Sequence, residues 1–406
     1  MKTVCFVVLG FPKITETFIT NQVLQAKIHG YQTMILTERL MSFENSSQAE
    51  LLTEHALLES TQVIDFKIPK NKIKRRAKAF VLILKYLKYW LRVKDISFRE
   101  RFSMLPFQLA FYYQFKEVSV FHIQFALAGI QIAKMKSIGL LSGRLVTTFH
   151  GYDAHYENLE ELSSLKLRYK LLLKESLYLT VNTAYLAKKI LSFGAQASSI
   201  KIIPMGIDLD FFNSKTEKRI SLNSTIQLLS VGRLIELKGF EYAIKSIKLL
   251  VDRGYKVSYT IIGEGREKDS LLELITTLKL QDTVFLVGVK TQKEIKDLFE
   301  MHDIFLMSSI TDKTNRAEAQ GVVTAEAQAM GLPVIAFRSS GVPYTLLDTE
   351  TGFLIEEKNV EAYAEAIRKL ATNPVLYKTM SVTAKNFATE NFSRKTLSAK
   401  FFDLYH

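Results

Sequence analysis

The stretch Arg316–Pro333, RAEAQGVVTAEAQAMGLP, decides the fold, because it has the pattern of a loop and a helix that join two apolar strands. The first strand is predicted at Asp303–Met307 (DIFLM), and the second, VIAF, follows Pro333. Gly321 is expected to open the helix, and Gly331 to end it, since a glycine just past the last turn is a common helix stop. A strand, a helix and a second strand in this order predict a parallel βαβ unit.

The same stretch carries two carboxylates, Glu318 in the loop and Glu326 in the helix, with seven residues between them. The amides of Val322 and Val323, at the start of the helix, suit a phosphate. The carboxylates suit sugar hydroxyls instead, because an ionised carboxylate accepts O–H hydrogen bonds. A phosphate together with two sets of hydroxyls describes a nucleotide sugar. The alternative is an ordinary βαβ crossover whose glutamates are only solvated.

Length and composition indicate a globular protein of two domains. The chain has 406 residues, of which 48% are hydrophobic and 23% charged, and this length is too great for one core. Its single cysteine, Cys5, excludes an intramolecular disulfide, and no Cys/His cluster has the spacing of a metal site. The first apolar run is interpreted as a strand and not as a signal peptide, and no run reaches the roughly 20 residues that span a bilayer. We therefore expect a cytoplasmic protein.

The charge is strongly basic, since 54 Lys and Arg against 41 Asp and Glu give a net charge of +13. This excess favours an anionic partner. Between Lys72 and Lys94 the cations alternate with aromatic and aliphatic residues, a pattern typical of helices on an anionic membrane surface. We therefore predict basic amphipathic helices over residues 71–116 and a peripheral location on the inner face of the cell membrane. The alternative is internal packing with the lysine heads reaching solvent, and nucleic acid is not expected because no recognition motif accompanies the charge.

Strands and helices alternate along the chain in two halves, which meet where Pro and Gly interrupt the pattern at Pro204–Asp208. This alternation predicts an α/β protein with a parallel, doubly wound sheet in each half. We expect domains at residues 1–205 and 206–386 and a last segment, 387–406, with a helix capped by Ser393. Because ligands of such sheets bind beyond the carboxyl ends of the strands, the site is expected in the cleft between the domains.

Several loops at predicted strand ends supply candidate site residues. In GRLIELKG, Arg233 and Lys238 could neutralise a diphosphate, although surface cations before a helix are the alternative. Gly263 and Glu264 begin a tight turn that allows a ligand to approach the backbone. Gly288 follows the next strand and could offer backbone groups to a base.

His150 and Asp153 follow a predicted strand at residues 144–148. They could form a general-base pair at the site. The alternative is a structural turn, in which Asp153 binds the backbone and His150 is neutral.

Together these motifs resemble those of the retaining GT-B glycosyltransferases of family four. The motifs are GRLIELKGF, IIGEG, the Glu318–Glu326 pair, GLPVIA and SSGVPY in the second half, and FPKITETFI, HIQFA, TFHGYDA and IPMGIDLDFF in the first. The resemblance covers the chain except about residues 40–118, and it is greatest for members that build bacterial exopolysaccharide, capsule or colanic-acid-type repeat units. It implies the GT-B fold, with an acceptor-binding first domain, a nucleotide-sugar-binding second domain and a last helix that crosses back onto the first.

The resemblance also implies roles for individual residues. Arg233 and Lys238 would hold the diphosphate and stabilise the leaving group. Glu318 would contact the hydroxyls of the donor sugar, and Glu326 those of the ribose. His150 would lie under the donor sugar, close to the reacting centre.

Backbone groups and the first loop complete the implied site. The expected donor-binding residues are Gly232, Gly263, Glu264, Gly288, Gly321, Val322, Val323 and Glu326. Many relatives have paired glycines after the first strand, whereas this chain has Gly10 and then Phe11, Pro12 and Lys13. This loop is still expected to face the cleft on the acceptor side, together with Thr17 and Asp153, but which atom touches the phosphate or the acceptor stays open.

The mechanism implied by the resemblance is transfer with retained anomeric configuration and without a metal ion. No Asp-x-Asp sequence lies in a plausible metal-binding loop, and Arg233, Lys238 and helix amides can replace a cation electrostatically. We therefore expect a hexosyltransferase without a cofactor, which moves a sugar from a UDP- or GDP-sugar to a lipid-linked or polysaccharide acceptor in surface polysaccharide synthesis. The alternatives are a soluble acceptor and a non-catalytic module that binds nucleotide sugars.

Overall fold

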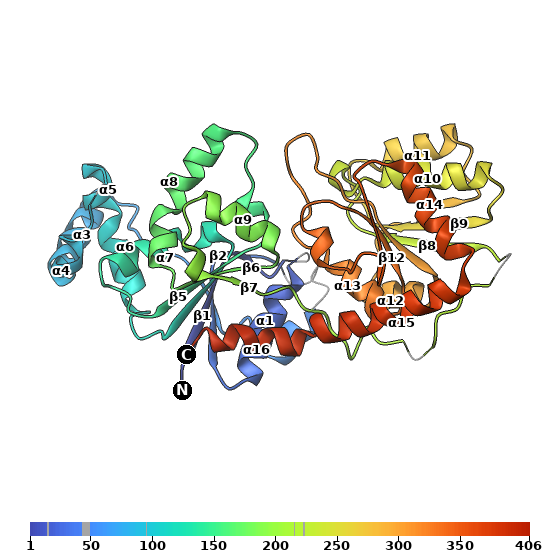
Figure 1. Cartoon of the computed structure of the whole chain (residues 1–406). Helices are drawn as coiled ribbons and strands as arrows, with labels where there is room; N and C mark the ends of the chain where they lie inside the picture. The colour runs from blue at the N-terminus through green and yellow to red at the C-terminus, as the bar shows by residue number, and fades with distance from the viewer. Residues whose placement is uncertain (14–15, 43–48, 95, 215, 222–223) are drawn as a thin grey trace.

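The computed structural model describes residues 1–13, 16–42, 49–94, 96–214, 216–221 and 224–406. Two lobes lie side by side, each built on a parallel sheet with helices packed against it (Figure 1). The predicted α/β architecture with two doubly wound sheets is confirmed. Ile14 and Thr15 of the predicted first loop lie outside the described residues.

The first lobe contains a seven-stranded sheet in the order β3-β2-β1-β4-β5-β6-β7, with every neighbouring pair parallel. The interior strand β1 reads TVCFVVLGF, a nearly continuous apolar run, as expected of a strand covered on both faces. The strands are β1 (Thr3–Phe11), β2 (Gln32–Leu40), β3 (Thr61–Val63), β4 (Val120–Gln124), β5 (Arg144–Phe149), β6 (Tyr178–Val181) and β7 (Ile200–Ile202).

Nine helices accompany this sheet in the described part of the first lobe. They are α1 (Thr17–Ile28), α2 (Ala49–Glu54), α3 (Lys72–Lys85), α4 (Leu87–Trp90), α5 (Phe98–Ser103), α6 (Leu105–Tyr113), α7 (Ile130–Ser137), α8 (Leu159–Glu175) and α9 (Ala184–Ser192). The helices α8 and α9 begin where the side chains of Asn158 and Thr183 accept hydrogen bonds from the first turn, as helix caps do.

The second lobe contains a six-stranded parallel sheet in the order β10-β9-β8-β11-β12-β13. The strands are β8 (Ile226–Val231), β9 (Val257–Ile262), β10 (Val284–Leu286), β11 (Ile304–Met307), β12 (Val334–Phe337) and β13 (Gly352–Ile355). The helices that follow in the chain are α10 (Phe240–Asp252), α11 (Lys268–Thr277), α12 (Gln292–Met301), α13 (Val322–Ala329), α14 (Val360–Ala371), α15 (Pro374–Asn391) and α16 (Arg394–Asp403).

The helix α13 begins and ends at the glycines that the sequence marks. Gly321 and Gly331 have φ values of 82° and 81°, which favour glycine. At the C-terminal end, the Gly331 N–H donates to the Gln328 carbonyl at 2.8 Å and the Leu332 N–H to the Ala327 carbonyl at 3.0 Å. This is the Schellman pattern, so the predicted start and stop of the helix are confirmed.

The chain passes between the lobes twice, and the two passages are bound to each other. The Ile207 N–H donates to the Phe392 carbonyl at 2.8 Å, and the Arg394 N–H donates to the Ile207 carbonyl at 2.9 Å. Gly206 permits this approach, since a Cβ there would lie 2.6 Å from the Arg394 Cα. Ser393 caps α16 as predicted, and α16 packs against α1 of the first lobe (Figure 1). The helix α15 continues to Asn391, past the domain boundary expected at residue 387.

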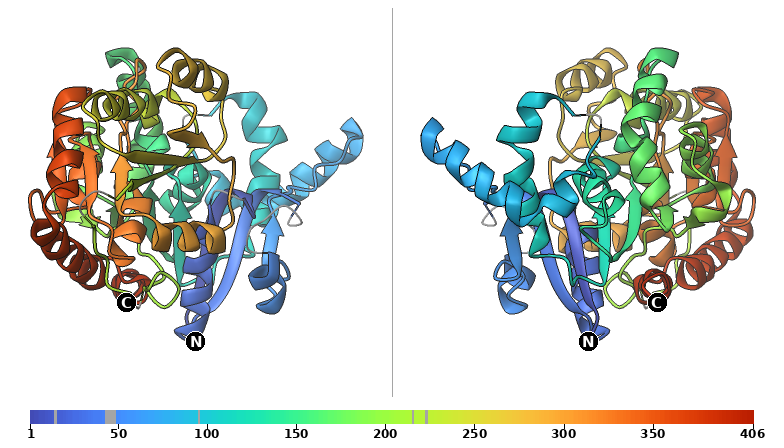
Figure 2. Two further views of the ribbon diagram at one scale, coloured as in Figure 1. Left: turned by 90° about the vertical axis from the view of Figure 1, so that its right-hand side faces the viewer. Right: turned by 90° about the vertical axis from the view of Figure 1, so that its left-hand side faces the viewer.

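The predicted basic helices over residues 71–116 form α3 to α6, which differ in their environment. The helix α6 is largely buried, whereas α3 has only one buried side chain, that of Ala79. In both views of Figure 2 the light-blue α3 projects from the body of the molecule. Within the described residues, no helix is both long and apolar enough to cross a membrane.

Candidate functional site

A cavity of about 640 Å³ lies between the lobes, at the carboxyl ends of strands from both sheets. The first lobe contributes residues that follow β5 and β6, and the second lobe contributes the loop after β8 and the start of α13. Ten predicted site residues line this cavity: Thr17, His150, Gly232, Arg233, Lys238, Glu318, Gly321, Val322, Val323 and Glu326. The expectation of a site between the two domains therefore agrees with the geometry.

Glycines shape the loop after β8 that carries the two cations. A Cβ on Gly263 would lie 1.9 Å from the Gly232 carbonyl oxygen, and one on Gly239 would lie 2.1 Å from the Ser308 carbonyl oxygen. Both glycines also have positive φ values. The loop can pack this closely only without side chains at these positions, and it thereby brings Arg233 and Lys238 to the cavity wall.

The Lys238 ammonium and the Glu318 carboxylate form an ion pair of 2.5 Å, and their side chains are 15% and 19% exposed. Burial raises the pKa of Glu318, but Lys238, the Gly321 amide and Arg233 outweigh this effect and hold the pKa below its ordinary value. Glu318 is therefore ionised at neutral pH. The Gly321 amide at the start of α13 thus helps to stabilise the ionised form of this carboxylate.

Arg233 is exposed and lines the cavity beside Lys238. Among the described residues, none forms a hydrogen bond or an ion pair with its guanidinium. Such a group can bind an anionic ligand through two parallel N–H donors without first breaking a contact within the protein.

Glu326 is half-buried on α13, and its carboxylate accepts no hydrogen bond from the residues that the structure describes. Burial raises the pKa of Glu326 to about 7, while Arg394 acts in the opposite direction. Arg394 itself forms an ion pair of 3.2 Å with Asp208. Both oxygens of Glu326 can therefore accept hydrogen bonds from the hydroxyls of a ligand.

The imidazole of His150 lies between the rings of Phe18 and Phe125, with centroid distances of 4.6 and 4.5 Å. Its Nε2 lies 2.8 Å from Oε1 of Gln124. Burial lowers the pKa of His150 to about 3, so the ring is neutral at physiological pH.

Asp153 does not form the general-base pair with His150 that the sequence allows. Its carboxylate accepts hydrogen bonds from the backbone N–H groups of Ala126 at 2.8 Å, His150 at 3.0 Å and Gly151 at 3.2 Å. Burial raises the pKa of Asp153 to about 6, against these hydrogen bonds. Asp153 is 2% exposed and shapes the loop after β5, so its role is that of the structural turn given above as the alternative. His150, by contrast, lines the cavity.

Six further predicted residues lie outside the lining of the cavity: Gly263, Glu264, Gly288, Phe11, Pro12 and Lys13. We call the loop after β8, which carries Arg233 and Lys238, the cation loop. Gly263 and Gly288 support it through a hydrogen bond of 2.9 Å from the Gly263 N–H to the Gly288 carbonyl. Glu264 pairs instead with Lys268 at 2.8 Å on the surface. The loop after β1 is closed by an ion pair of 2.8 Å between Lys13 and Glu16.

Asn182 and Arg394 are among the lining residues that the sequence did not predict. Asn182 directly follows β6, is 5% exposed and has no hydrogen-bond partner for Oδ1 within the described chain. The strand-end rule that identifies His150 could have identified Asn182 as well. Arg394 comes from the helix that crosses back to the first lobe, and no local pattern marks it as a site residue.

Polar contacts hold the two lobes together around the cavity. The Thr183 hydroxyl donates to the Ala319 carbonyl at 2.9 Å. The Gln320 side chain accepts from the Met205 N–H at 2.8 Å and donates to the Met205 carbonyl at 3.0 Å. The loop that contains Glu318 is thus fixed against the first lobe on its C-terminal side.

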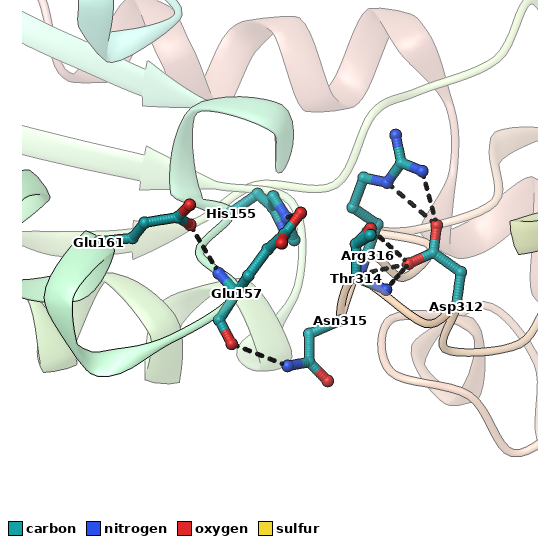
Figure 3. A network of polar contacts seen from close by, with 7 residues as sticks. All are labelled: His155, Glu157, Glu161, Asp312, Thr314, Asn315 and Arg316. Carbon is teal, nitrogen blue, oxygen red and sulfur yellow. Dashed lines mark hydrogen bonds and ion pairs between the residues drawn. The ribbon is translucent and has the colours of Figure 1, made fainter.

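Figure 3 shows a further contact between the lobes, together with the polar contacts that surround it in each lobe. The Asn315 side chain donates to the Glu157 carbonyl at 3.1 Å. Arg316 forms an ion pair of 2.9 Å with Asp312 inside the same loop. His155 lies nearby in the first lobe, and its Nε2 is buried without a hydrogen-bond partner among the described residues.

The cavity therefore combines two cations and a helix N-terminus with two carboxylates and a neutral histidine. This combination can bind a ligand that carries both negative charge and hydroxyl groups. Across the described residues, no three His, Cys, Asp or Glu side chains gather in a way that could hold a metal ion.

Two family models match the chain, one in each lobe. The model described as Glycosyltransferase Family 4 matches residues 71–211, and the model described as Glycosyl transferases group 1 matches residues 213–387. The boundary between the two matches falls in the segment that joins the lobes.

Similar proteins agree with these matches over almost the whole chain. The amylovoran biosynthesis glycosyltransferase AmsK of Erwinia amylovora is 29% identical over 377 residues, which cover 90% of each chain. The putative colanic acid biosynthesis glycosyltransferase WcaL of Escherichia coli K12 is 28% identical over 371 residues, which cover 89% of each chain. The crystal structure of Anabaena HepE in complex with UDP has a TM-score of 0.74 at 17% identity and covers 100% of this chain and 99% of its own. The chain is thus an enzyme with the GT-B fold and belongs to the glycosyltransferases of family 4 and group 1.

Proposed function

We propose that this enzyme moves a sugar from a UDP- or GDP-sugar to a lipid-linked or polysaccharide acceptor in the synthesis of a bacterial surface polysaccharide. The proposal rests on one observation: Arg233, which has no partner in the described chain, lies beside Lys238 in the same cavity as Glu318 and Glu326. The names of two relatives support the polymer class, since they refer to amylovoran and colanic acid synthesis. The UDP bound to Anabaena HepE supports a nucleotide donor.

The diphosphate of the donor is proposed to bind between the cation loop and the start of α13. Arg233 would contact it through a bidentate fork, and Lys238 as a point charge. Lys238 is already paired with Glu318. The diphosphate must therefore either share the Lys238 ammonium with this carboxylate or displace the carboxylate from it. Glu318 is then free to accept hydrogen bonds from hydroxyls of the donor sugar.

Glu326 is proposed to bind the two hydroxyls of the ribose. Its carboxylate is half-buried and without a partner among the described residues, so the hydroxyls would supply the hydrogen bonds that it lacks. An ionised carboxylate accepts two such bonds from adjacent hydroxyls, whereas a protonated one loses an acceptor.

We propose transfer on one face of the sugar, which retains the anomeric configuration. The bond between the anomeric carbon and the diphosphate oxygen breaks, and the acceptor oxygen forms its bond to that carbon on the same side. The proton of the acceptor hydroxyl passes to the departing phosphate oxygen. Arg233 and Lys238 stabilise the negative charge that grows on the diphosphate, so the proposed reaction needs no metal ion.

The helix α3 supports a location at the membrane. Spacings of seven and four residues place Ile73, Phe80 and Leu84 on one helix face, and these side chains are 79%, 62% and 59% exposed. We call this face, together with its flanking cations, the α3 surface. Its exposed cations are Lys72, Lys74, Arg76, Lys78 and Lys85.

An apolar strip between two rows of cations has the chemistry of a helix that lies on anionic lipid. The partly buried side of α3 packs against α5 and α6, so the exposed strip is left for another partner. We therefore propose that the α3 surface holds the enzyme peripherally on the inner face of the cell membrane, where lipid-linked acceptors are found.

A panel of nucleotide sugars tests the proposal. Melting curves would be recorded with UDP-, GDP- and ADP-sugars, and the best ligand should raise the melting temperature, since a hundredfold excess over Kd stabilises the native state by about 2.7 kcal/mol. The Arg233→Ala variant, used as control, should show no such shift. If no nucleotide stabilises the parent protein, the donor assignment is wrong.

The reaction would then be followed with the donor found in this way. Product from a lipid-linked or saccharide acceptor should keep the anomeric configuration of the donor in its NMR spectrum, and EDTA should leave the rate unchanged. Inverted product contradicts retention, and a rate that EDTA abolishes and magnesium restores contradicts metal independence. Nucleotide-sugar binding without transfer or hydrolysis favours the non-catalytic module.

A further inference from the structure

His150 is the first member of a chain of buried hydrogen bonds that runs into the core of the first lobe. Its Nε2 lies 2.8 Å from Oε1 of Gln124, whose Nε2 donates to Gln22 at 2.5 Å and lies 3.3 Å from Nε2 of His122. Nδ1 of His122 lies 2.5 Å from the hydroxyl of Tyr405. Gln124 and His122 have no exposed surface.

The residues of this hydrogen-bonded series come from elements far apart in the sequence. His122 and Gln124 are two residues apart on β4, so both side chains leave the sheet on one face. Thr148 and His150 lie on and just after the neighbouring β5, with Thr148 in register with Gln124. Tyr405 follows α16, the helix that crosses back from the second lobe. Buried polar groups are costly unless hydrogen-bonded, and apolar residues would fill this space at less cost.

The donors and acceptors fix the position of each proton. Oε1 of Gln124 can only accept, so Nε2 of His150 carries the proton and Nδ1 is left with a lone pair. The amide of Gln124 points toward Nε2 of His122, which therefore accepts, and the Thr148 hydroxyl at 2.7 Å can donate to the same nitrogen. The proton of His122 is then on Nδ1 and is donated to the Tyr405 hydroxyl.

The assignment above places only one proton on each imidazole, so both histidines must be neutral. Burial lowers the pKa of His122 and of His150 to about 3, and each of the two rings would otherwise carry a charge into the core. Among the described residues, none donates a hydrogen bond to Nδ1 of His150. That nitrogen is therefore the one that a ligand in the cavity can reach.

We propose that Gln124 and His122 are positioning residues, anchored by Tyr405, that hold His150 as the tautomer with a free Nδ1 lone pair for a hydroxyl of the bound donor sugar. This rests on the proposed function, because it places the sugar beside His150. In this arrangement His150 is a hydrogen-bond acceptor and not a proton donor. The tautomer of a histidine is set by the group that binds its other nitrogen.

Nitrogen NMR of the protein labelled with ¹⁵N-histidine tests the tautomer without any ligand. The His150 signals, assigned with the His150→Gln variant, should show a proton on Nε2 and an unprotonated Nδ1. In the Gln124→Met variant, which removes the acceptor at similar volume, the two tautomers should mix. A parent protein with the proton on Nδ1 of His150, or a Gln124→Met variant with unchanged signals, overturns the proposal.

Kinetics test the consequence for the reaction. Gln124→Met should lower kcat about tenfold and leave the affinity for UDP or GDP within twofold, because the nucleotide does not touch His150. Tyr405→Phe removes only the far anchor and should have a smaller effect in the same direction. Equal losses in kcat and in nucleotide affinity would indicate a general structural role instead.

Thr147→Val serves as the matched control, since it removes a buried hydrogen bond of 2.9 Å to Ser176 from the same strand, one residue before Thr148. It should lower the melting temperature and leave both the His150 signals and kcat unchanged. Failure of the proposed function can be told apart from failure of this proposal. If the parent protein consumes no nucleotide sugar, a donor sugar is not the partner of Nδ1 of His150. The NMR measurement of the tautomer does not depend on that result.

Discussion

Lys238 and Glu318 form an ion pair of 2.5 Å, although they lie eighty residues apart in the sequence. This ion pair joins the cation loop, which follows β8, to the loop that precedes α13. A diphosphate that approaches Lys238 must compete with a carboxylate that is already bound. The same competition would release Glu318 toward the hydroxyls of the sugar.

Lys238→Ala should slow the reaction strongly. It removes one charged group that stabilises the departing diphosphate, and the loss of such a group costs about 2 to 4 kcal/mol of transition-state stabilisation, or roughly 30- to 1000-fold in kcat/KM. Steady-state rates with the preferred nucleotide sugar measure this. Lys245→Ala is the control, because Lys245 pairs with Glu241 at 2.8 Å on α10 and should lose less than twofold. A Lys238→Ala variant within twofold of the parent contradicts the assignment.

Arg233→Ala should also lower kcat/KM by about 2 to 4 kcal/mol, but without changing the stability of the protein. Arg233 has no partner in the described chain, so its removal breaks no contact, and the free energy of unfolding should change by less than about 0.5 kcal/mol. Urea unfolding and kinetics on the same sample separate the two effects. Arg233→Lys should recover only part of the rate, since it keeps the charge and loses the fork. Full recovery would show that charge alone matters.

The parts of the site that lie near one another in the sequence are predictable from local signals. Gly331 marks the end of α13 because helices commonly end at a left-handed residue, and Gly321, also left-handed, stands at its start. Arg233, Lys238 and His150 are found by asking which side chains follow strands, since the carboxyl ends of parallel strands meet at one edge.

Contacts between distant segments carry no such local signal. The pair between Lys238 and Glu318 and the chain from His150 to Tyr405 depend on how whole elements pack. Asp153 has the residue type of a catalytic group, and only its backbone partners show that it shapes a turn. The strand β13 (Gly352–Ile355) was not among the strands expected from the sequence.

Glu326→Gln should weaken the binding of the nucleotide, with the fold retained, because an amide has one acceptor oxygen where the carboxylate has two. In the parent protein the affinity should fall as the pH drops below about 7, the pKa to which burial raises Glu326. Titration calorimetry with UDP or GDP between pH 5.5 and 8 measures both effects. An affinity that is the same in both proteins rejects the ribose role.

The raised pKa of Glu326 also predicts how stability changes with pH. The native state binds this proton more tightly than the unfolded chain, whose carboxyl has an ordinary pKa near 4.5. The parent protein therefore loses stability as the pH rises from about 4.5 to about 7. The difference in melting temperature between Glu326→Gln and the parent should grow in favour of the variant over this window. A difference that is constant with pH would mean that the carboxyl is not perturbed.

Asp153→Ala should destabilise the first lobe and slow the reaction together. It leaves the N–H groups of Ala126, His150 and Gly151 without their acceptor, and a buried group that loses its partner costs about 1 to 3 kcal/mol. The total is therefore expected to be at least about 3 kcal/mol in urea unfolding. Asp65→Ala, at an exposed carboxylate that pairs with Lys67, should leave the stability almost unchanged, because exposed ion pairs contribute little. A stable Asp153→Ala variant would mean that the turn does not depend on the carboxylate.

The α3 surface should bind vesicles that contain anionic lipid, and the double variant Phe80→Ser and Leu84→Ser should bind them much less. Burying each of these side chains in the lipid interface contributes about 1.5 to 3 kcal/mol, so even partial burial predicts a loss of more than tenfold in partitioning. Vesicle flotation at low and high salt measures it, and the cations predict weaker binding at high salt and to zwitterionic lipid.

Leu272→Ser, at an exposed position of α11 in the second lobe, provides the control and should bind like the parent. The double variant should keep its kcat with a water-soluble acceptor, since α3 contributes no residue to the cavity. Loss of that activity would instead connect α3 to the fold of the site. If anionic vesicles fail to retain the parent protein even at low salt, the membrane location is wrong and the soluble-acceptor alternative takes its place.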